Sequence, residues 1–297
     1  MFKNQKFEMK KYLILGASGL LGAKLLTYLP QSHGTYFENK TNMGINMSYL
    51  DMNNLESFEF LLEKIKPDVV INCTGMTNVD LCERFPEKCW KLNCWLPVTL
   101  AKECNAKSIK YVYISSDHFL NLSGAKLKER DVCVPINQYG FSKLNAEKLI
   151  YSENKYSLII RANFFHFNLH SPKTFLDQLL CSIKQGKIAY SFSDVLFTPI
   201  STFQMAMYIQ DLVEKDFIGV INISSSEVLS KFDFHNAILK ELYPRADFHL
   251  PALLESIGLD AARPRYMALD NSLLQETLGV KVPSIYDMIQ TELNLIK

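Results

Sequence analysis

The sequence lacks an excess of charge of either sign. Its 32 lysines and arginines are balanced by 31 aspartates and glutamates, which leaves a formal net charge of +1 over 297 residues. A chain with this balance has no electrostatic reason to bind nucleic acid or an anionic membrane surface. We therefore expect neither as a partner, and any negatively charged ligand has to be held by local groups.

Long apolar segments are also missing. No uninterrupted apolar run reaches the ~18 residues needed to cross a bilayer, and the opening MFKNQKFEMKK lacks the apolar core and cleavage site of a signal peptide. The seven cysteines are an odd number in a long chain, which is typical of reduced thiols. We expect a cytoplasmic protein.

The sequence has no paired cysteine spacing of the kind found in zinc sites. Four cysteines fall close together, at Cys73, Cys82, Cys89 and Cys94. None of them forms a Cys-x-x-Cys pair. His166 and His170 have the spacing of a metal-binding helix, but the Glu of a zinc motif is absent. We predict no metal site.

What the sequence does contain is an alternation of short β-branched runs and longer amphipathic runs. Strands are expected at 11–16, 34–37, 68–75, 110–117 and 157–163. Helices are expected between them, at 20–29, 54–66, 89–105 and 138–154. Alternation with short connections indicates an α/β fold of the Rossmann type, a doubly wound parallel sheet covered on both faces.

Beyond about residue 165 the alternation loosens. Residues 173–186 look helical and 219–225 resemble a strand, while the tail is mostly helical and loop-like. We predict a dinucleotide-binding domain over 10–165, with a returning segment near 187–225. The rest of 166–297 would form mainly a smaller, C-terminal substrate-binding lobe.

The turn between the first strand and the first helix is rich in glycine. Glycines in such a turn allow a tight exit from the strand and a close approach of the backbone to a pyrophosphate, while the helix N-terminus offers free N–H groups. The spacing is Gly-x-x-Gly-x-x-Gly, and its strand–turn–helix context favours a dinucleotide over a mere packing turn. The predicted cofactor-binding residues here are Gly16, Ser18, Gly19, Leu20, Leu21 and Gly22.

The sequence leaves the choice between NAD(H) and NADP(H) open. Glu38 follows the second strand, where an acidic side chain can bind the ribose 2′-hydroxyl of NAD. Lys40 could instead meet the 2′-phosphate of NADP, and a solvated loop carrying both charges is the third alternative. Asp51 and Met52 precede the second helix, where they would flank the adenine.

The pattern Tyr-x-x-x-Lys occurs three times, beginning at Tyr36, Tyr139 and Tyr151. The first copy straddles a strand end, and the third runs through turn-forming residues at the end of a helix. Only the copy Tyr139–Lys143 opens a helix, where positions i and i+4 share one face. This copy is the candidate active site.

Ser116 supports that choice because it ends the fourth expected strand, at the edge where ligands bind in open α/β sheets. Its hydroxyl can bond a substrate carbonyl while Tyr139 donates a proton to the same oxygen. A free phenol has a pKa near 10, and the Lys143 ammonium is expected to lower it. Lys143 could also hold the nicotinamide ribose. Ser116, Tyr139 and Lys143 are the predicted catalytic residues.

These residues resemble the extended short-chain dehydrogenase/reductase superfamily, and more narrowly the dTDP-4-dehydrorhamnose reductase family. The similarity runs from GASGLLG through PDVVINCTGMTNVDLCE, WKLNCWLPVTLA, YISSDHF and ERDVCVPINQYGFSKLNAE to SDVLFTPIS and ARPRYMALDNSLL. It implies reduction of a 4-keto group on a nucleotide-linked 6-deoxysugar by NADPH or NADH, in polysaccharide biosynthesis. A nucleotide sugar is the expected partner, and a homodimer is the assembly expected if the chain self-associates.

The resemblance also implies further site residues. The cofactor-binding set gains Cys73, Thr74, Gly75 and Asn93, and the substrate-binding set is Asp117, His118, Asn163 and Arg263. His118 stands where the family usually has Tyr, which leaves the sugar open. Asp117 could equally cap a strand end, and Arg161 could either orient the site or form a structural salt bridge. Arg263 suits bidentate contacts to a diphosphate, with a surface role as its alternative.

Two other functions remain open at this point. An epimerase or dehydratase would recycle bound NAD without net oxidation, although Asp117 lacks the following Glu expected of a dehydratase. A non-catalytic role is the other, because the regulatory beta subunit of methionine adenosyltransferase resembles the same family. The complete set of Ser116, Tyr139 and Lys143 argues for catalysis.

Overall fold

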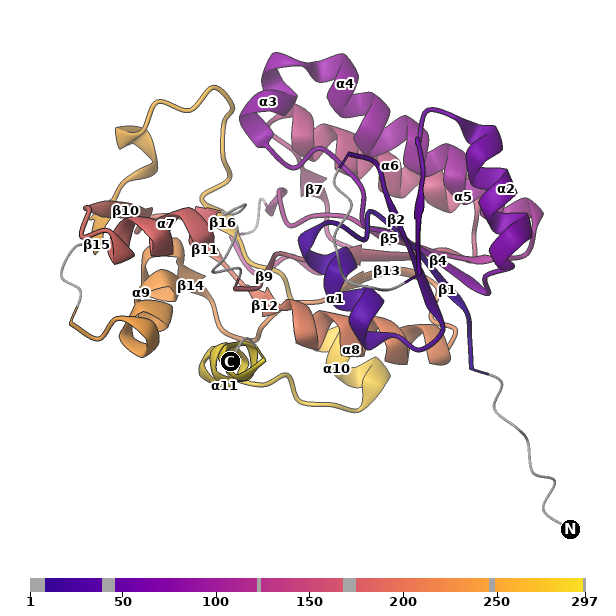
Figure 1. The fold of residues 1–297 in the computed structure, drawn as a ribbon. Helices are drawn as coiled ribbons and strands as arrows, with labels where there is room; N and C mark the ends of the chain where they lie inside the picture. The colour runs from indigo at the N-terminus through magenta and orange to yellow at the C-terminus, as the bar shows by residue number, and fades with distance from the viewer. Residues whose placement is uncertain (1–8, 39–45, 122–123, 168–174, 246–248, 296–297) are drawn as a thin grey trace, which may run out of the picture.

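A parallel sheet forms the centre of the computed structural model, which describes residues 9–38, 46–121, 124–167, 175–245 and 249–295 (Figure 1). Its seven strands follow the order β13-β8-β5-β4-β1-β2-β3, and every neighbouring pair is parallel. The strands are β1 (Tyr12–Leu15), β2 (Ser32–Tyr36), β3 (Met47–Tyr49), β4 (Val69–Asn72), β5 (Lys110–Ile114), β8 (Leu158–Arg161) and β13 (Gly219–Asn222). The predicted doubly wound α/β fold is confirmed.

The chain reverses its direction across the sheet next to β1. From β1 it proceeds to β2 and β3 at one edge, and then it returns to β4 on the other side of β1. In sheets of this kind the carboxyl ends of the two strands at the reversal diverge and leave a crevice for a ligand. The fold therefore predicts a binding site above β1 and β4.

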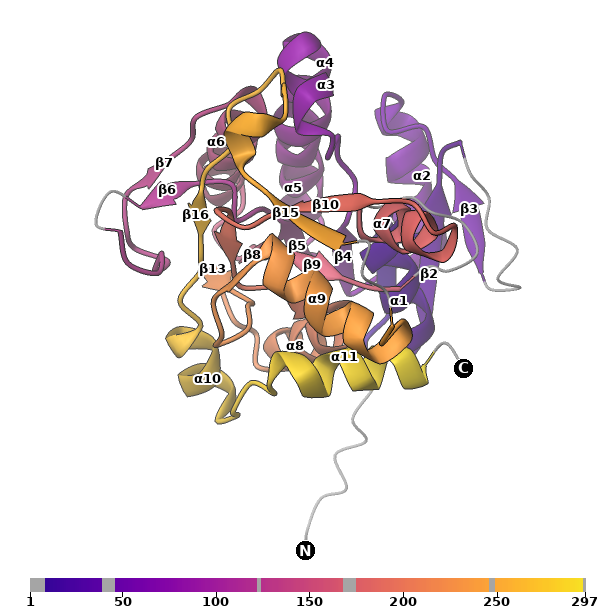
Figure 2. The same cartoon turned by 90° about the vertical axis from the view of Figure 1, so that its left-hand side faces the viewer.

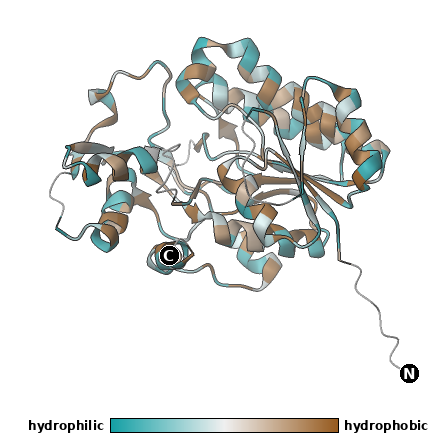
Figure 3. Ribbon diagram, viewed as in Figure 1, coloured by the Kyte–Doolittle hydropathy of each residue, from teal (hydrophilic) through white to brown (hydrophobic). Residues whose placement is uncertain are grey.

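Helices cover both faces of the sheet because side chains of successive strand residues point to opposite faces. Tyr12 and Ile14 contribute to one apolar core, and Leu13 and Leu15 to the other. The first core includes residues of α1 (Leu20–Tyr28), α8 (Thr202–Glu214), α10 (Ser272–Leu278) and α11 (Ile285–Asn294). The second includes α2 (Leu55–Ile65), α5 (Leu96–Ala106) and α6 (Gln138–Glu153). Figure 3 shows the apolar colouring concentrated on the central strands and the helix faces toward them.

A group of smaller elements lies beside the sheet, beyond the carboxyl ends of its strands (Figure 2). Strand β10 (Ala189–Phe192) pairs with β15 (His249–Ala252), β11 (Leu196–Phe197) lies between β14 (Leu229–Ser230) and β16 (Tyr266–Met267), and β9 (Phe164–Phe165) pairs with β12 (Ile200–Ser201). Helices α7 (Phe175–Lys184) and α9 (Lys231–Leu242) pack with them. Within the predicted returning segment, β13 joins the central sheet, whereas the exact domain bounds stay a prediction.

The remaining elements are short helices, strands and a turn. They are α3 (Val79–Arg84), α4 (Pro86–Trp90), β6 (Leu120–Asn121), β7 (Cys133–Val134) and a 3₁₀ turn at Leu254–Ser256. No helix in the described part of the chain has the length and apolar character to cross a membrane.

The helix expected over 89–105 is broken by a π-helical turn at Lys91–Trp95. Pro97 is the second residue of the following helix α5, and a proline has no N–H to donate to the carbonyl four residues earlier. That carbonyl belongs to Asn93, and it accepts a 2.7 Å hydrogen bond from the Tyr113 hydroxyl instead. The local widening thus follows from the proline, and it fixes the position of Asn93. Strand β3 was also not expected, because its three residues form no apolar run.

The turn from β1 into α1 is held tightly by glycine. Gly16 has φ +78°, a left-handed conformation that favours glycine. A Cβ at Gly22 would lie 2.3 Å from the Gly16 carbonyl oxygen and 2.9 Å from Ala17 Cα. The first turn of α1 therefore packs directly on the end of β1, as the sequence pattern predicts.

Substituting Gly22→Ala tests this contact. We expect the free energy of unfolding in urea to fall by about 1–3 kcal/mol, because the backbone has to move to accept the methyl group. Alanine's greater helix propensity, ~1 kcal/mol, acts in the opposite direction. Gly258→Ala is the control, since a Cβ there has no heavy atom within 4 Å. Equal stability of both variants and the parent would contradict the packing.

Candidate active site

A cavity of about 440 Å³ opens at the carboxyl ends of the central strands. Its lining comes from the segments that follow β1, β4, β5 and β8, and from α6. From these segments it includes residues 19–22, 73–75, 114–118 and 162–164, and from α6 it includes Tyr139 and Lys143. This is the crevice that the reversal of strand order predicts.

The N-terminus of α1 faces this cavity without a side-chain cap. Gly19 is the N-cap residue and forms no side-chain hydrogen bond to the helix, and Leu20, Leu21 and Gly22 line the cavity with it. The first N–H groups of a helix have no partner within the helix, so here they remain available to an anion.

Helix α6 carries the candidate catalytic pair, and its start is firmly anchored. The Asn137 side chain caps the helix by accepting a 2.8 Å hydrogen bond from Gly140 N, and it donates a 2.7 Å bond to the Ala262 carbonyl. Tyr139 and Lys143 follow within the first turns, and both are buried. The helix thus brings the two side chains to the same cavity, as the sequence predicts.

Burial raises the pKa of Tyr139 well above its ordinary value, although a hydrogen bond with Ser116 partly offsets this effect. The expectation of a lowered pKa for Tyr139 is therefore wrong. A buried phenolate loses its hydration, and the negative charge of Asp117 disfavours it further. The phenol is accordingly protonated at neutral pH, the form needed to donate a proton.

Lys143 lines the cavity and is held from the end of β5. Its Nζ donates a 2.9 Å hydrogen bond to the Ile114 carbonyl and lies 4.7 Å from the centroid of the Tyr113 ring. Burial lowers the pKa of Lys143 to about 8, and the charge of Glu147 opposes that decrease. Near neutral pH this ammonium is charged but close to its titration point.

A buried ion pair supports Lys143 from one turn further along α6. Glu147 Oε2 accepts a 2.6 Å bond from Arg161 Nη2, and Arg161 Nε donates to both carboxylate oxygens. The Ser115 hydroxyl also donates to Glu147. Of the two roles left open for Arg161, the structure shows the salt bridge. This network ties α6 to the ends of β5 and β8.

Polar side chains form one wall of the cavity. Asp117 Oδ2 accepts a 2.8 Å hydrogen bond from Asn163 Nδ2, and burial raises the pKa of Asp117 to about 6. His118 packs edge-on against Tyr139, with ring centroids 5.3 Å apart. Burial lowers the pKa of His118 to about 3, and its buried Nδ1 has no hydrogen-bond partner among the described residues. The imidazole is thus neutral, and its ring lines the cavity while the Nδ1 atom itself is buried.

Asn93 supports the cavity from behind. Its Oδ1 accepts a 2.7 Å hydrogen bond from Met76 N, and its Nδ2 donates a 3.0 Å bond to the Met76 carbonyl. Thr74 is held in turn by a 2.6 Å hydroxyl bond to Asn72 Oδ1. Asn93 is fully buried, so in this conformation it fixes the segment after β4. Its direct contact with a cofactor stays a prediction.

Several predicted binding residues lie outside the lining of this cavity. Glu38 is exposed after β2, and Lys40 falls outside the described residues. Asp51 Oδ1 accepts a 2.9 Å bond from Asn53 N. The other predicted residues outside the lining are Gly16, Ser18, Met52, Asn93 and Arg263. Their contacts with a cofactor or substrate stay predictions.

Arg263 is occupied by neighbouring groups. Its Nη2 forms a 2.9 Å ion pair with Asp80, and its Nη1 donates a 2.8 Å bond to the Ala261 carbonyl. Its charge nevertheless contributes to the lowered pKa of His118. A diphosphate contact would require the guanidinium to share or exchange the Asp80 carboxylate, so that role also stays a prediction.

The histidines and cysteines considered above as metal ligands are mostly buried or bonded to other groups where the structure describes them. His166 Nδ1 lies 2.6 Å from Glu292 Oε2, and His170 is outside the described residues. Cys82, Cys89 and Cys94 are buried. Within the described residues no group of three or more His, Cys, Asp or Glu side chains is arranged to hold a metal ion.

The other two Tyr-x-x-x-Lys copies differ from the copy in α6. Tyr36 ends β2, and its partner Lys40 lies outside the described residues. Tyr151 is 50 % exposed near the end of α6, and Lys155 lies beyond that helix. Of the residues of the three copies that the structure describes, Tyr139 and Lys143 line the cavity.

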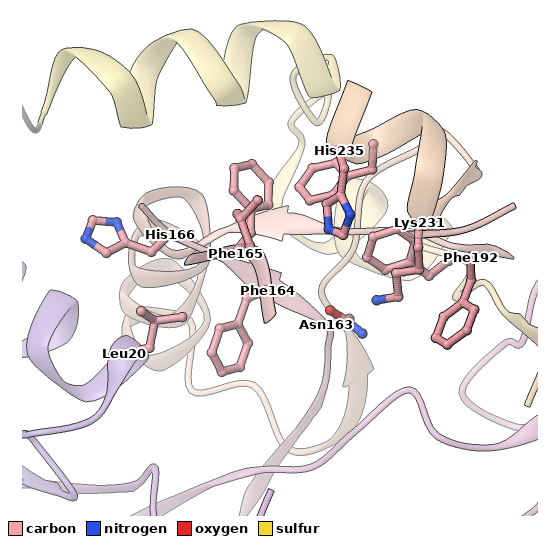
Figure 4. Close-up of a pocket in the computed structure, with 11 residues that line it drawn as sticks. Leu20, Asn163, Phe164, Phe165, His166, Phe192, Lys231 and His235 are labelled. Carbon is pink, nitrogen blue, oxygen red and sulfur yellow. The ribbon is translucent and has the colours of Figure 1, made fainter. Parts of the chain in front are cut away.

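Sequence reasoning missed a second, smaller cavity. It has a volume of about 260 Å³ and adjoins the first, since Leu20, Asn163 and Phe164 line both (Figure 4). Lys231, at the start of α9, lines it too. No motif in the sequence marks Lys231, because α9 is brought here only by the tertiary fold.

Comparison with known families covers almost the whole chain. The model of the family described as "RmlD substrate binding domain" matches residues 9–296. The chain belongs to this family. The predicted resemblance to the dTDP-4-dehydrorhamnose reductase family is confirmed by this match and by the relatives of that name.

Individual members of the family are distant in sequence. The chain is 27% identical to a "probable low-salt glycan biosynthesis reductase" of Haloferax volcanii, over 92% of this chain and 94% of that protein. It is 26% identical to the methionine adenosyltransferase 2 subunit beta of Pongo abelii, over 91% of this chain and 83% of the relative. A crystal structure of dTDP-4-dehydrorhamnose reductase from Bacillus anthracis, in complex with NADP, superimposes with a TM-score of 0.85 at 21% identity, covering 97% of this chain and all of that one.

The buried ion pair between Arg161 and Glu147 can be tested by substitution. Arg161→Met leaves Glu147 as an unpaired buried charge, so we expect the free energy of unfolding to fall by about 3–5 kcal/mol. Adding Glu147→Gln to this variant removes the charge, and it should recover part of the loss. Urea unfolding at neutral pH measures both. A double variant no more stable than Arg161→Met would contradict this account.

Proposed function

We propose that this chain reduces a 4-keto group on a nucleotide-linked deoxysugar, with NADPH or NADH as the hydride donor. The observation that carries the proposal is the placement of Ser116, Tyr139 and Lys143 in one cavity above the strand ends. Membership of the RmlD family supports it, as do the relatives described as reductases.

The residues of the first turn fit a dinucleotide. The uncapped N-terminus of α1 offers N–H groups to a diphosphate, and Gly19 and Gly22 leave no side chain in the way. Cys73, Thr74 and Gly75, beyond β4, line the same cavity. The related reductase whose structure contains NADP has this fold, which supports a nicotinamide coenzyme here.

The side chains divide the chemistry between them. Reduced nicotinamide supplies a hydride when bound. Ser116 donates a hydrogen bond to the substrate carbonyl and holds it against Tyr139, whose phenol is protonated and donates its proton to the same oxygen. Lys143 then stabilises the phenolate that remains, because its ammonium is charged at neutral pH.

The polar wall is the proposed contact for the sugar. Asp117 and Asn163 offer an acceptor and donors, and His118 offers a neutral ring nitrogen that has no partner in the described structure. Arg263, beside Asp80, is the proposed contact for the diphosphate of the substrate. These groups suit the hydroxyls and phosphates of a nucleotide sugar.

A panel of nucleotide-linked 4-keto sugars tests the reaction, with loss of the absorbance of NADPH or NADH as the signal. The proposal expects turnover of at least one sugar and a preference for one coenzyme. Coenzyme that stays bound without net oxidation, while the sugar inverts, would instead indicate an epimerase.

Tyr139→Phe tests the proton donor. We expect the rate of reduction to fall at least ~100-fold, because the substituted ring has no proton to transfer. Binding of NADPH, measured by fluorescence titration, should remain. Tyr151→Phe is the matched control, since this exposed tyrosine belongs to another copy of the same pattern, and it should retain full activity. A near-normal rate for Tyr139→Phe would remove the phenol from the mechanism.

A regulatory role is the second candidate function. It is favoured by the 26% identity to methionine adenosyltransferase 2 subunit beta. Stoichiometric co-purification with a partner enzyme, together with no turnover across the panel, would support this role. The presence of Ser116, Tyr139 and Lys143 in one cavity favours catalysis.

A further inference from the structure

The second cavity has a mostly aromatic lining with a single lysine. Its aromatic residues come from four segments of the fold and are Phe164, Phe165, Phe192, Phe197 and Phe234. The polar lining residues are Asn163, His166, Lys231 and His235 (Figure 4). Aromatic faces with a few polar groups are typical of sites for ring-shaped ligands.

Hydrogen bonds at the start of α9 hold the backbone of Lys231 next to this cavity. Ser230 caps α9 by accepting a 2.9 Å hydrogen bond from Asp233 N, and Lys231 N donates a 3.0 Å bond to the Val195 carbonyl. The side chain runs across the face of Phe197, with Nζ 3.4 Å from the ring centroid. Figure 4 shows the ammonium pointing toward Asn163. The cation is thus fixed at the junction of the two cavities.

The Lys231 ammonium has no hydrogen bond or ion pair in the described part of the chain, apart from its contact with the Phe197 ring. Burial lowers its pKa to about 8, and the charge of Asp117 opposes that decrease. Lys231 lines the open cavity and is half-buried, so an acceptor from outside the chain can reach its ammonium.

Asp117 faces Lys231 from the other cavity. Attraction to Lys231 lowers the pKa of Asp117, although burial dominates and raises it to about 6. No direct salt bridge joins the two groups among those that the structure describes, and Asp117 Oδ2 is bonded to Asn163 instead. Lys231 has no acceptor in the described part of the chain, and the Asp117 carboxylate can accept a hydrogen bond in addition to the one from Asn163. A hydroxyl group placed between them can accept from Lys231 and donate to Asp117.

We propose that Lys231 and Asp117 together bind one hydroxyl of the sugar ring, with Lys231 donating to its oxygen and Asp117 accepting its proton. The phenylalanines then pack against the apolar face of the ring. A sugar carboxylate fits less well, because it would lie beside the Asp117 carboxylate. This subsite rests on the proposed function, since it would bind the sugar part of that substrate.

The test compares binding of dTDP-rhamnose with binding of dTDP by calorimetry, in the full chain saturated with NADP. In Lys231→Met we expect affinity for dTDP-rhamnose to fall at least ~10-fold, the usual effect of losing a charge-assisted hydrogen bond. Affinity for dTDP should change less than about twofold, within the variation of surface substitutions. Lys231→Arg keeps a donor and should retain most of the affinity. Lys240→Met, at an exposed position of the same helix, should bind both as the parent does.

Three results would overturn the subsite. The first is an unchanged affinity for dTDP-rhamnose in Lys231→Met. The second is an equal loss of affinity for dTDP in that variant, which would place the lysine on a phosphate. The third is a parent protein that binds both ligands with equal affinity. If Lys231→Met does not fold, Lys231→Gln replaces it with the same expected selectivity. Failure of the reaction is a separate outcome, because Lys231-dependent binding without turnover on the sugar panel would reject the reductase and keep the subsite.

Discussion

The parallel sheet is the constraint on which the site depends. All seven strands end at the same edge, and the chain reverses between β1 and β4. The turn before α1, the segment after β4, Ser116 after β5 and Asn163 after β8 therefore meet at one cavity, although they are far apart in the sequence. Helix α6 adds Tyr139 and Lys143 from one face of the sheet. Substitutions that disturb strand order would dismantle every part of the site together.

Burial sets the protonation states within this cavity. Removing water disfavours the charged form of each group, so the pKa of Asp117 rises to about 6 and that of His118 falls to about 3. The pKa of Tyr139 rises for the same reason. Lys143 retains its charge near neutral pH because the Ile114 carbonyl and Glu147 compensate part of the burial. The protein is thus prepared to donate a proton rather than to accept one, which suits reduction of a ketone.

Much of this arrangement could be predicted from the sequence, because the signals are local. Apolar periodicity predicted β1, β2, β4, β5 and β8 and the main helices between them, although not the short elements such as β3. The glycine turn and the helix position of Tyr139 indicated residues that line the cavity, although Gly16 and Ser18 lie outside its lining. Three features depended on tertiary contacts. At the π-helical turn Lys91–Trp95, the Asn93 carbonyl that Pro97 leaves without a helical donor is satisfied by a tyrosine of β5. The raised pKa of Tyr139 follows from burial. Lys231 lines the second cavity although it lies far along the chain, at the start of α9.

The most direct test of the reductase follows the hydride itself. NADPH or NADH deuterated at the transferable position of the nicotinamide is mixed with a nucleotide-linked 4-keto sugar, and the sugar product is analysed by mass spectrometry and NMR. The account predicts one deuterium at C4 of the sugar for each coenzyme oxidised. A product that carries no deuterium, or a sugar that changes while the coenzyme stays reduced, would contradict it.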